Sequence, residues 1–211
     1  TQGVSSAASD VYKRQAVESA YSQGWRRVKL YFLTGLPTET DEDTLGILEM
    51  ARRCVEVGRV HQHNPSVTVS VGGFVPKPFT PFQWFGQNTE RELRRKVGLL
   101  RDELKRRPKT YRGVQLKWHD ARASVVEGLM SRGDRRLGAI IEDVWRSGGV
   151  FQEWSEHFDI RLWEDALDRH GLSLEDFVYR HRTEDEVLPW DHLSAGLHKD
   201  FLWQDLSLIH I

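Results

Sequence analysis

Hydrophobic residues in this chain gather in three short runs. Val28–Leu33 is almost wholly apolar, which is typical of a strand covered on both faces. Ser66–Val71 alternates strictly between polar and apolar residues and gives the clearest strand signal. Gly113–Trp118 is a third candidate. We therefore predict three strands at these positions.

Amphipathic stretches fill the intervals between these runs. Apolar residues recur at helical spacing after Thr40, which stands three residues before Asp43 and comes close to a capping box. We expect this first helix to end at Gly58. A long charged helix is predicted from Thr89, or from the residue before it, to about Arg107.

The order strand–helix–strand–helix–strand predicts an α/β fold with a parallel sheet and right-handed crossovers. Three strands are too few to close a barrel, so we expect part of a barrel or a small open sheet. Phe74–Trp84 contains three prolines and is not expected to be helical. Beyond His119 the pattern changes to short helices separated by glycine-containing breaks. The predicted helices are Ala121–Met130, Asp134–Arg146, Ile160–His170 and Leu174–Arg180.

Both ends of the chain differ in character from the rest. Residues 1–15 have no targeting pattern and resemble the translated sequencing adapter found at the ends of environmental gene fragments. Residues 206–211 resemble the matching sequence at the other end, and a natural polar tail is the alternative. We expect neither end to contribute to the structure. The expected organisation is an α/β core over residues 16–119 and a helical extension over residues 120–205.

Composition narrows the classes of function. The 211 residues include 30 basic and 31 acidic ones, and a formal net charge of −1 does not suggest a dedicated binder of nucleic acid or anionic membranes. No run reaches the ~18–20 apolar residues that a membrane span needs. We expect a soluble, cytoplasmic protein. The single cysteine, Cys54, excludes an intrachain disulfide and is predicted to be a buried structural thiol.

Residues suited to ligand binding follow the first predicted strand, in Gly35-Leu-Pro-Thr-Glu39. Ligands of α/β proteins bind at the carboxyl ends of strands. Gly35 would let a flat ring approach the backbone, Leu36 offers an apolar face, and Pro37 stiffens the turn. Glu39 is expected to orient the next helix or a neighbouring loop. An ordinary strand–turn–helix junction explains the same residues and remains an alternative.

A proline-rich loop follows the second predicted strand. It reads Phe74-Val-Pro-Lys-Pro-Phe-Thr-Pro-Phe-Gln-Trp84, and its prolines make it rigid. Lys77 stands between two of these prolines, where it could meet a carboxylate or a phosphate. The alternative is a solvated lysine on a surface loop.

Together the two segments resemble the late strands and loops of the radical S-adenosylmethionine (SAM) enzymes. They are most similar to the branch that carries a cobalamin-binding-type domain, and the resemblance covers residues 16–205. In that branch the second loop usually has His where this chain has Phe79, and the first turn often has Gly where this chain has Thr38. Phe79 has no group that could take over a proton-transfer role of that His.

The resemblance implies the C-terminal part of a partial (β/α)6 barrel that binds SAM. The residues it assigns to cofactor binding are Gly35, Leu36, Pro37, Glu39, Phe74, Val75, Pro76 and Lys77. It also implies a [4Fe–4S] cluster, a cobalamin-binding-type domain outside this chain, and an electron donor such as flavodoxin or ferredoxin. The reaction would be cleavage of SAM to a 5′-deoxyadenosyl radical, with methyl or methylthio transfer as the outcome by analogy. No catalytic residue is assigned.

One part of the family pattern is absent from this chain. The cluster is held by three thiolates in a Cys-x3-Cys-x2-Cys loop, whereas this chain has one cysteine. The resemblance therefore places the cluster ligands upstream, and we expect the chain on its own to be inactive and to hold no metal.

Two other functions remain open. The chain could be a non-enzymatic helical interaction module on an α/β scaffold, or a SAM- or nucleotide-binding α/β enzyme that needs no cluster. Arg132, Arg135 and Arg136 could bind a phosphate, but their acidic neighbours Asp134 and Glu142 favour a structural network of ion pairs.

Overall fold

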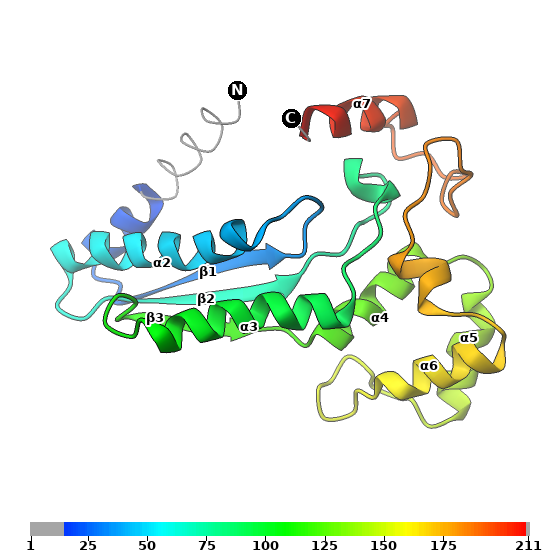
Figure 1. Cartoon of the computed structure of the whole chain (residues 1–211), viewed down its shortest axis with the longest axis horizontal. Helices are drawn as coiled ribbons and strands as arrows, with labels where there is room; N and C mark the ends of the chain where they lie inside the picture. Colours follow the sequence, from blue (N-terminus) through cyan, green and yellow to red (C-terminus); the bar gives the residue numbers. More distant parts are fainter. Residues whose placement is uncertain (1–14, 210–211) are drawn as a thin grey trace. The chain divides into compact units, whose positions relative to one another are not determined.

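The computed structural model describes residues 15–209, and the side chains of residues 15–207. Residues 15–22 are helical, and the remaining elements follow in the order drawn in Figure 1. These are β1 (Arg27–Thr34), α2 (Asp41–His61), β2 (Ser66–Gly73), the 3-10 turn η1 (Pro81–Trp84), α3 (Glu90–Arg106), β3 (Val114–Trp118), α4 (Ala121–Arg132), α5 (Leu137–Arg146), α6 (Ile160–Arg169), the π-helical turn η2 (Glu175–Tyr179) and α7 (Lys199–Ile209).

The three strands form one sheet in the order β1-β2-β3. β2 and β3 are parallel, with Val67 opposite Val114 and Val71 opposite Trp118. β1 runs in the same direction as β2 (Figure 1). The predicted α/β fold with a parallel sheet is therefore confirmed as a three-stranded sheet with several helices.

The chain divides into two compact units. Among the described residues, the first contains residues 15–34, Glu39–Gly72 and Arg94–His119; the second contains Gly35–Thr38, Gly73–Leu93 and residues 120–209. One boundary between the units falls after His119, and the loops that follow β1 and β2 belong to the second unit. They do so because Leu93 and Ser124, both of that unit, lie against their glycines.

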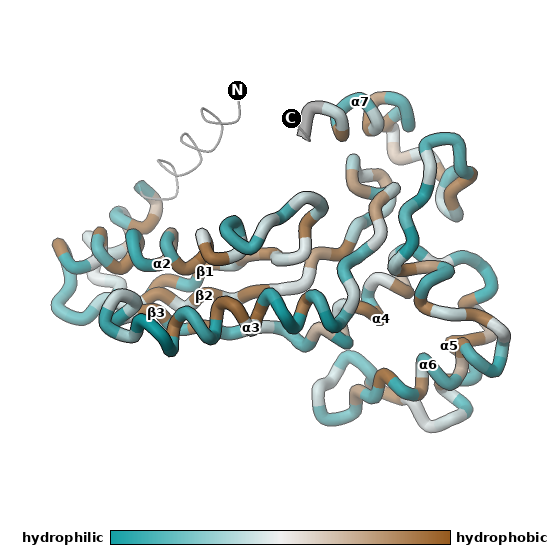
Figure 2. Tube along the Cα trace, in the orientation of Figure 1, coloured by the Kyte–Doolittle hydropathy of each residue, from teal (hydrophilic) through white to brown (hydrophobic). Residues whose placement is uncertain are grey.

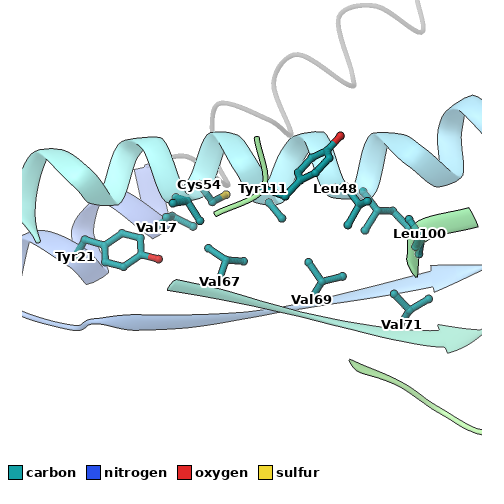
Figure 3. Close-up of a cluster of buried hydrophobic side chains, with 12 residues drawn as sticks. Val17, Tyr21, Leu48, Cys54, Val67, Val69, Val71, Leu100 and Tyr111 are labelled. Carbon is teal, nitrogen blue, oxygen red and sulfur yellow. The ribbon is translucent and has the colours of Figure 1, made fainter. Parts of the chain in front are cut away.

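The core of the first unit lies on one face of the sheet. Alternate residues of β2, Val67, Val69 and Val71, point toward α2 (Figure 3) and are at most 1% exposed. Leu48 of α2 and Leu100 of α3 belong to the same buried cluster, so both crossover helices cover this face. Hydrophobic valines alternate with Ser and Thr along β2, and α3 carries hydrophobic residues among many hydrophilic ones (Figure 2). In a sheet with the order β1-β2-β3, two right-handed crossover connections place both helices on the same face.

Cys54 is buried at the centre of this core, as predicted. The capping box is also present: the Thr40 side chain accepts from the Asp43 N–H, and the Asp43 carboxylate accepts from the Thr40 N–H. The predicted end of the helix at Gly58 is wrong, because α2 continues to His61. A Cβ at Gly58 would lie 2.6 Å from Pro65 Cβ and 2.8 Å from the Tyr21 ring. Gly58 is therefore a close-contact site within the helix.

The second unit has two hydrophobic clusters. One joins α4, α5, α6 and η2 around Leu129, Ile140 and Phe177. The other surrounds Trp84, which is 2% exposed, with Trp190 and Leu202. The helical extension predicted over residues 120–205 is thus built from short helices. Figure 1 shows them in yellow-green to red.

Two predictions about this unit need correction. The prolines of the second loop do not exclude all helical structure, since Pro81 occupies the first turn of η1, where its missing N–H costs no hydrogen bond. Residues 206–211 were expected to make no contribution, yet Leu206 of α7 is 6% exposed and packs in the Trp84 cluster. Residues 1–14 and 210–211 of the two ends lie outside the described residues.

Candidate functional site

Gly35, the residue after β1, is held in a conformation that only glycine adopts easily. Its φ is +88°, and its carbonyl accepts a hydrogen bond of 2.7 Å from Asn88 Nδ2. A Cβ at this position would lie 2.7 Å from Leu93 Cδ2. Leu93 and Asn88 therefore occupy the side of the Gly35 Cα where a side chain would project, and this close approach also requires glycine.

Gly73, the last residue of β2, packs against the same leucine. A Cβ there would lie 3.0 Å from Leu93 Cδ1 and 2.9 Å from Ser124 Oγ. Since one leucine side chain contacts both glycines, the two loops leave the sheet on the same side. The prediction that Gly35 and Phe74 lie on one rim, at the carboxyl ends of parallel strands, is confirmed.

Glu39 lies in the first unit, in a buried polar network. Its carboxylate Oε1 accepts hydrogen bonds from the hydroxyls of Thr34 at 2.9 Å and Thr44 at 2.6 Å. Lys96 of α3 places its Nζ 3.6 Å from the same oxygen and donates to the Glu39 carbonyl at 3.2 Å. The side chains of Lys96 and Glu39 are 4% and 7% exposed. The network joins the end of β1 to α2 and α3, which is the orienting role expected of Glu39.

Lys96 was missed by the sequence reasoning, although a signal existed. Leu93, Lys96, Leu100 and Glu103 follow one another at three- and four-residue intervals and are all buried. A lysine on the apolar stripe of an amphipathic helix needs a buried partner, because an isolated buried charge is costly.

Thr38 has a φ of +66°, which is strained for a β-branched residue. The family resemblance places glycine at this position. Replacing Thr38 by Gly should therefore raise the free energy of unfolding by about 1 kcal/mol, the usual cost of the left-handed conformation, less the backbone entropy that glycine loses on folding. Thr110, an exposed turn residue without positive φ, gives the control: Thr110→Gly should destabilise. Urea denaturation measures both, and a loss of stability in Thr38→Gly would contradict the reading.

The second loop is fixed by contacts at both ends. The Phe74 ring packs edge-on against Phe82, with 5.3 Å between centroids. Val75 and Pro76 are buried. Lys77 Nζ lies 2.6 Å from the Glu127 carboxylate and 2.8 Å from the Ser131 hydroxyl of α4. Lys77 thus pairs with a carboxylate of this chain, and its predicted role toward a bound ligand stays a prediction.

Gln83 was not identified from the sequence, yet it organises this loop. The side chain is 2% exposed, and its Oε1 accepts from the Phe79 N–H at 3.1 Å and from Trp190 Nε1 at 2.7 Å. Phe79 itself has a φ of +58°. The amide of Gln83 therefore ties the loop to a residue more than a hundred positions away, a link that local patterns do not reveal.

Of the eight residues that the family resemblance assigns to cofactor binding, seven lie in the second unit and Glu39 lies in the first. Gly35, Val75 and Pro76 are buried, whereas Leu36, Pro37, Phe74 and Lys77 are half-buried. These four half-buried residues therefore keep surface that is accessible from outside the protein.

The described residues contain no group of three or more His, Cys, Asp or Glu side chains arranged to hold a metal ion. Cys54 lies in the core and does not fit the role of a cluster ligand. None of the helices within residues 15–209 is long and apolar enough to cross a membrane.

The predicted network of ion pairs is present only in part: of Arg132, Arg135 and Arg136, Arg136 pairs with Asp134, whereas Glu142 pairs with Arg146. Arg136 Nη2 lies 2.8 Å from Asp134, and Arg146 Nη2 lies 2.6 Å from Glu142. The Arg136 guanidinium lowers the pKa of Asp134. Arg132, by contrast, is completely buried.

Comparison with known proteins gives one distant relative. The chain is 26% identical over 127 residues to Uncharacterized protein MJ0966 of Methanocaldococcus jannaschii. The match covers 60% of this chain and 26% of that protein, so the chain spans about a quarter of the relative's length. No family model and no solved structure matches the chain.

Proposed function

We propose that this chain is the C-terminal half of a radical SAM core with a family-specific helical extension. The observation that carries the proposal is the meeting of the two sequence motifs. Gly35 and Gly73 lie at the carboxyl ends of neighbouring parallel strands, on the same side of the sheet, and both pack against the side chain of Leu93. Loops at the carboxyl ends of parallel strands form the binding rim of (β/α) barrels.

The residues of this chain fit one part of the cofactor and not the other. Leu36, Pro37 and Phe74 keep half-buried apolar surface next to the two strand ends, which suits an adenine ring. The cluster does not fit this chain, since its only cysteine is in the core. When bound, SAM would supply a 5′-deoxyadenosyl radical, with the electron coming from a flavodoxin- or ferredoxin-like donor.

Other residues of the chain hold the rim in place. The Glu39–Lys96 network fixes the approach to α2, and the bonds of Lys77 to Glu127 and Ser131 fix the second loop on α4. A preorganised rim lowers the entropy that is lost when a ligand binds. Methyl or methylthio transfer, with or without cobalamin, remains the proposed outcome by analogy alone.

The two alternative functions make different demands on the gene. A helical interaction module or a cluster-independent SAM- or nucleotide-binding enzyme needs no cysteine-rich loop. The radical SAM proposal requires a Cys-x3-Cys-x2-Cys loop within about 150–200 residues before Ala16, the length that the remaining strand–helix units of a barrel require. Sequencing the gene upstream of Ala16 tests this. A start codon just before Ala16 would contradict the proposal.

The chain by itself should hold no iron–sulfur cluster and should not cleave SAM, because one thiolate is present where three are needed. Anaerobic reconstitution with iron and sulfide, followed by absorption spectroscopy and iron analysis, measures the first property. Analysis of the products after incubation with SAM and dithionite measures the second. A stoichiometric cluster on the chain would show that the ligands are not where we place them.

A further inference from the structure

Two arginines of the second unit are buried together. Arg132, at the end of α4, is 0% exposed, and Arg182, which follows η2, is 5% exposed. Both guanidiniums donate to the same backbone carbonyl: Arg132 Nε lies 3.3 Å and Arg182 Nη2 lies 3.4 Å from the oxygen of Phe177. Two positive charges therefore lie close together in the interior of this unit.

Their other hydrogen bonds also go to the backbone. Arg132 Nη1 donates to the carbonyls of Pro76 and Gln83, each at 3.3 Å. Arg182 Nη2 donates to the Arg132 carbonyl at 3.0 Å. Carbonyl oxygens satisfy N–H groups but carry no net charge, so these bonds do not neutralise either cation.

Three buried nitrogens of this pair have no hydrogen-bond partner within the described part of the chain: Arg132 Nη2, Arg182 Nε and Arg182 Nη1. The carboxylate of Glu186 forms a long ion pair with Arg182, 3.9 Å from its Nε and beyond hydrogen-bond distance, and the Arg182 guanidinium lies 5.2 Å from the Trp190 ring centroid. That carboxylate is already engaged by Arg180, whose Nη1 donates to it at 2.9 Å. Burial, together with the charges of Arg182 and Arg180, lowers the pKa of Arg132 to about 9.

Buried cations are ordinarily paired, and buried unpartnered donors call for an unseen water or ion. A water molecule would accept hydrogen bonds but would leave the charge repulsion in place. An anion both accepts the hydrogen bonds and offsets the repulsion, and guanidinium groups are well suited to bind one.

We propose that Arg132 and Arg182 form a binding site for a small inorganic anion, which accepts hydrogen bonds from their three unpartnered nitrogens. The chemical class is a halide or an inorganic oxyanion such as phosphate. Because Arg132 also holds Pro76 and Gln83, the bound anion would stabilise the second loop of the candidate site. The proposal stands on these contacts and does not depend on the proposed function.

Crystals of the whole chain soaked in bromide test the site directly. An anomalous peak within hydrogen-bond distance of Arg132 Nη2 and of Arg182 Nε or Nη1 would support a halide. Tetrahedral density at the same place in phosphate would support an oxyanion. Density that refines as water in both crystals would overturn the proposal.

A solution experiment provides the second measurement. At pH 7 and constant ionic strength, replacing gluconate by chloride or phosphate should raise the melting temperature by about 2–4 °C, the shift that a ligand well above its dissociation constant gives to a domain of this size. Arg182→Met should abolish the shift. Arg136→Met is the matched control: it removes an exposed arginine that lies 4.8 Å from the Phe177 ring centroid and should leave the shift unchanged. Equal melting temperatures of the unaltered chain in all three salts would contradict the proposal.

Discussion

Replacing Lys96 by Met should lower the free energy of unfolding by about 3–5 kcal/mol, the usual cost of removing one partner of a buried ion pair. Lys96 is 3% exposed, and its ammonium group is the cation beside the Glu39 carboxylate. Methionine preserves most of the aliphatic length, so the change isolates the charge. Without that ammonium group, the buried Glu39 carboxylate would keep its hydrogen bonds from the Thr34 and Thr44 hydroxyls but would lose the positive charge of Lys96. Urea denaturation measures the loss.

The neighbouring residue provides the control. Arg95 pairs with Asp41 at 2.6 Å, but those side chains are 44% and 51% exposed. Arg95→Met should therefore cost only about 0–1 kcal/mol. The double variant Glu39→Gln with Lys96→Met removes both charges, and it should recover part of the stability that Lys96→Met loses. Equal losses in Lys96→Met and Arg95→Met would show that the buried network does not stabilise the loop.

Replacing Gly58 by Ala should destabilise the chain by about 1–3 kcal/mol, as overpacking of a filled core usually does. The new methyl group would meet Pro65 and the ring of Tyr21, which is itself fixed by a hydrogen bond of 2.9 Å to the Ser66 carbonyl. This cost should exceed the ~1 kcal/mol that alanine gains over glycine inside a helix.

Gly46 of the same helix has no atom within 4 Å of the position of an added Cβ. Gly46→Ala should therefore stabilise the chain by about 0.5–1 kcal/mol. The two substitutions are chemically identical, so changes in stability of opposite sign would come from the different surroundings of the two glycines. Thermal unfolding of both variants measures the difference, and stabilisation by Gly58→Ala would contradict the close contact.

Local patterns predicted most of the fold because its signals lie within short stretches. The apolar run of β1, the alternation of β2 and the Thr40 capping box each involve neighbouring residues, and the two strands and the capping box are present. The prediction that β1 is covered on both faces is wrong, because Tyr31 and Leu33 on one of its faces are 72% and 54% exposed. Helix α7 was not predicted, since its stability depends on packing against Trp84, far away in the sequence.

The candidate site was predictable in position but not in detail. The turn residues after β1 and β2 identified the edge of the sheet at the carboxyl ends of the strands, because glycine and proline are common where strands end. The close approach of Leu93 to Gly35 was not foreseen, because Leu93 is distant from Gly35 in the sequence. Lys96 and Gln83 form hydrogen bonds with residues that are distant in the sequence. Arg132 donates to backbone carbonyls, and such bonds cannot be predicted from a pattern of side chains.

The most direct test of the account is production of 5′-deoxyadenosine by the longer protein in which this chain would stand. Purified anaerobically and supplied with SAM and a reductant, that protein should release 5′-deoxyadenosine. Phe74→Ala should raise the concentration of SAM needed, whereas Phe201→Ala, which changes an exposed phenylalanine of α7, should not. Failure of the longer protein to form 5′-deoxyadenosine while it holds a complete [4Fe–4S] cluster would contradict the account.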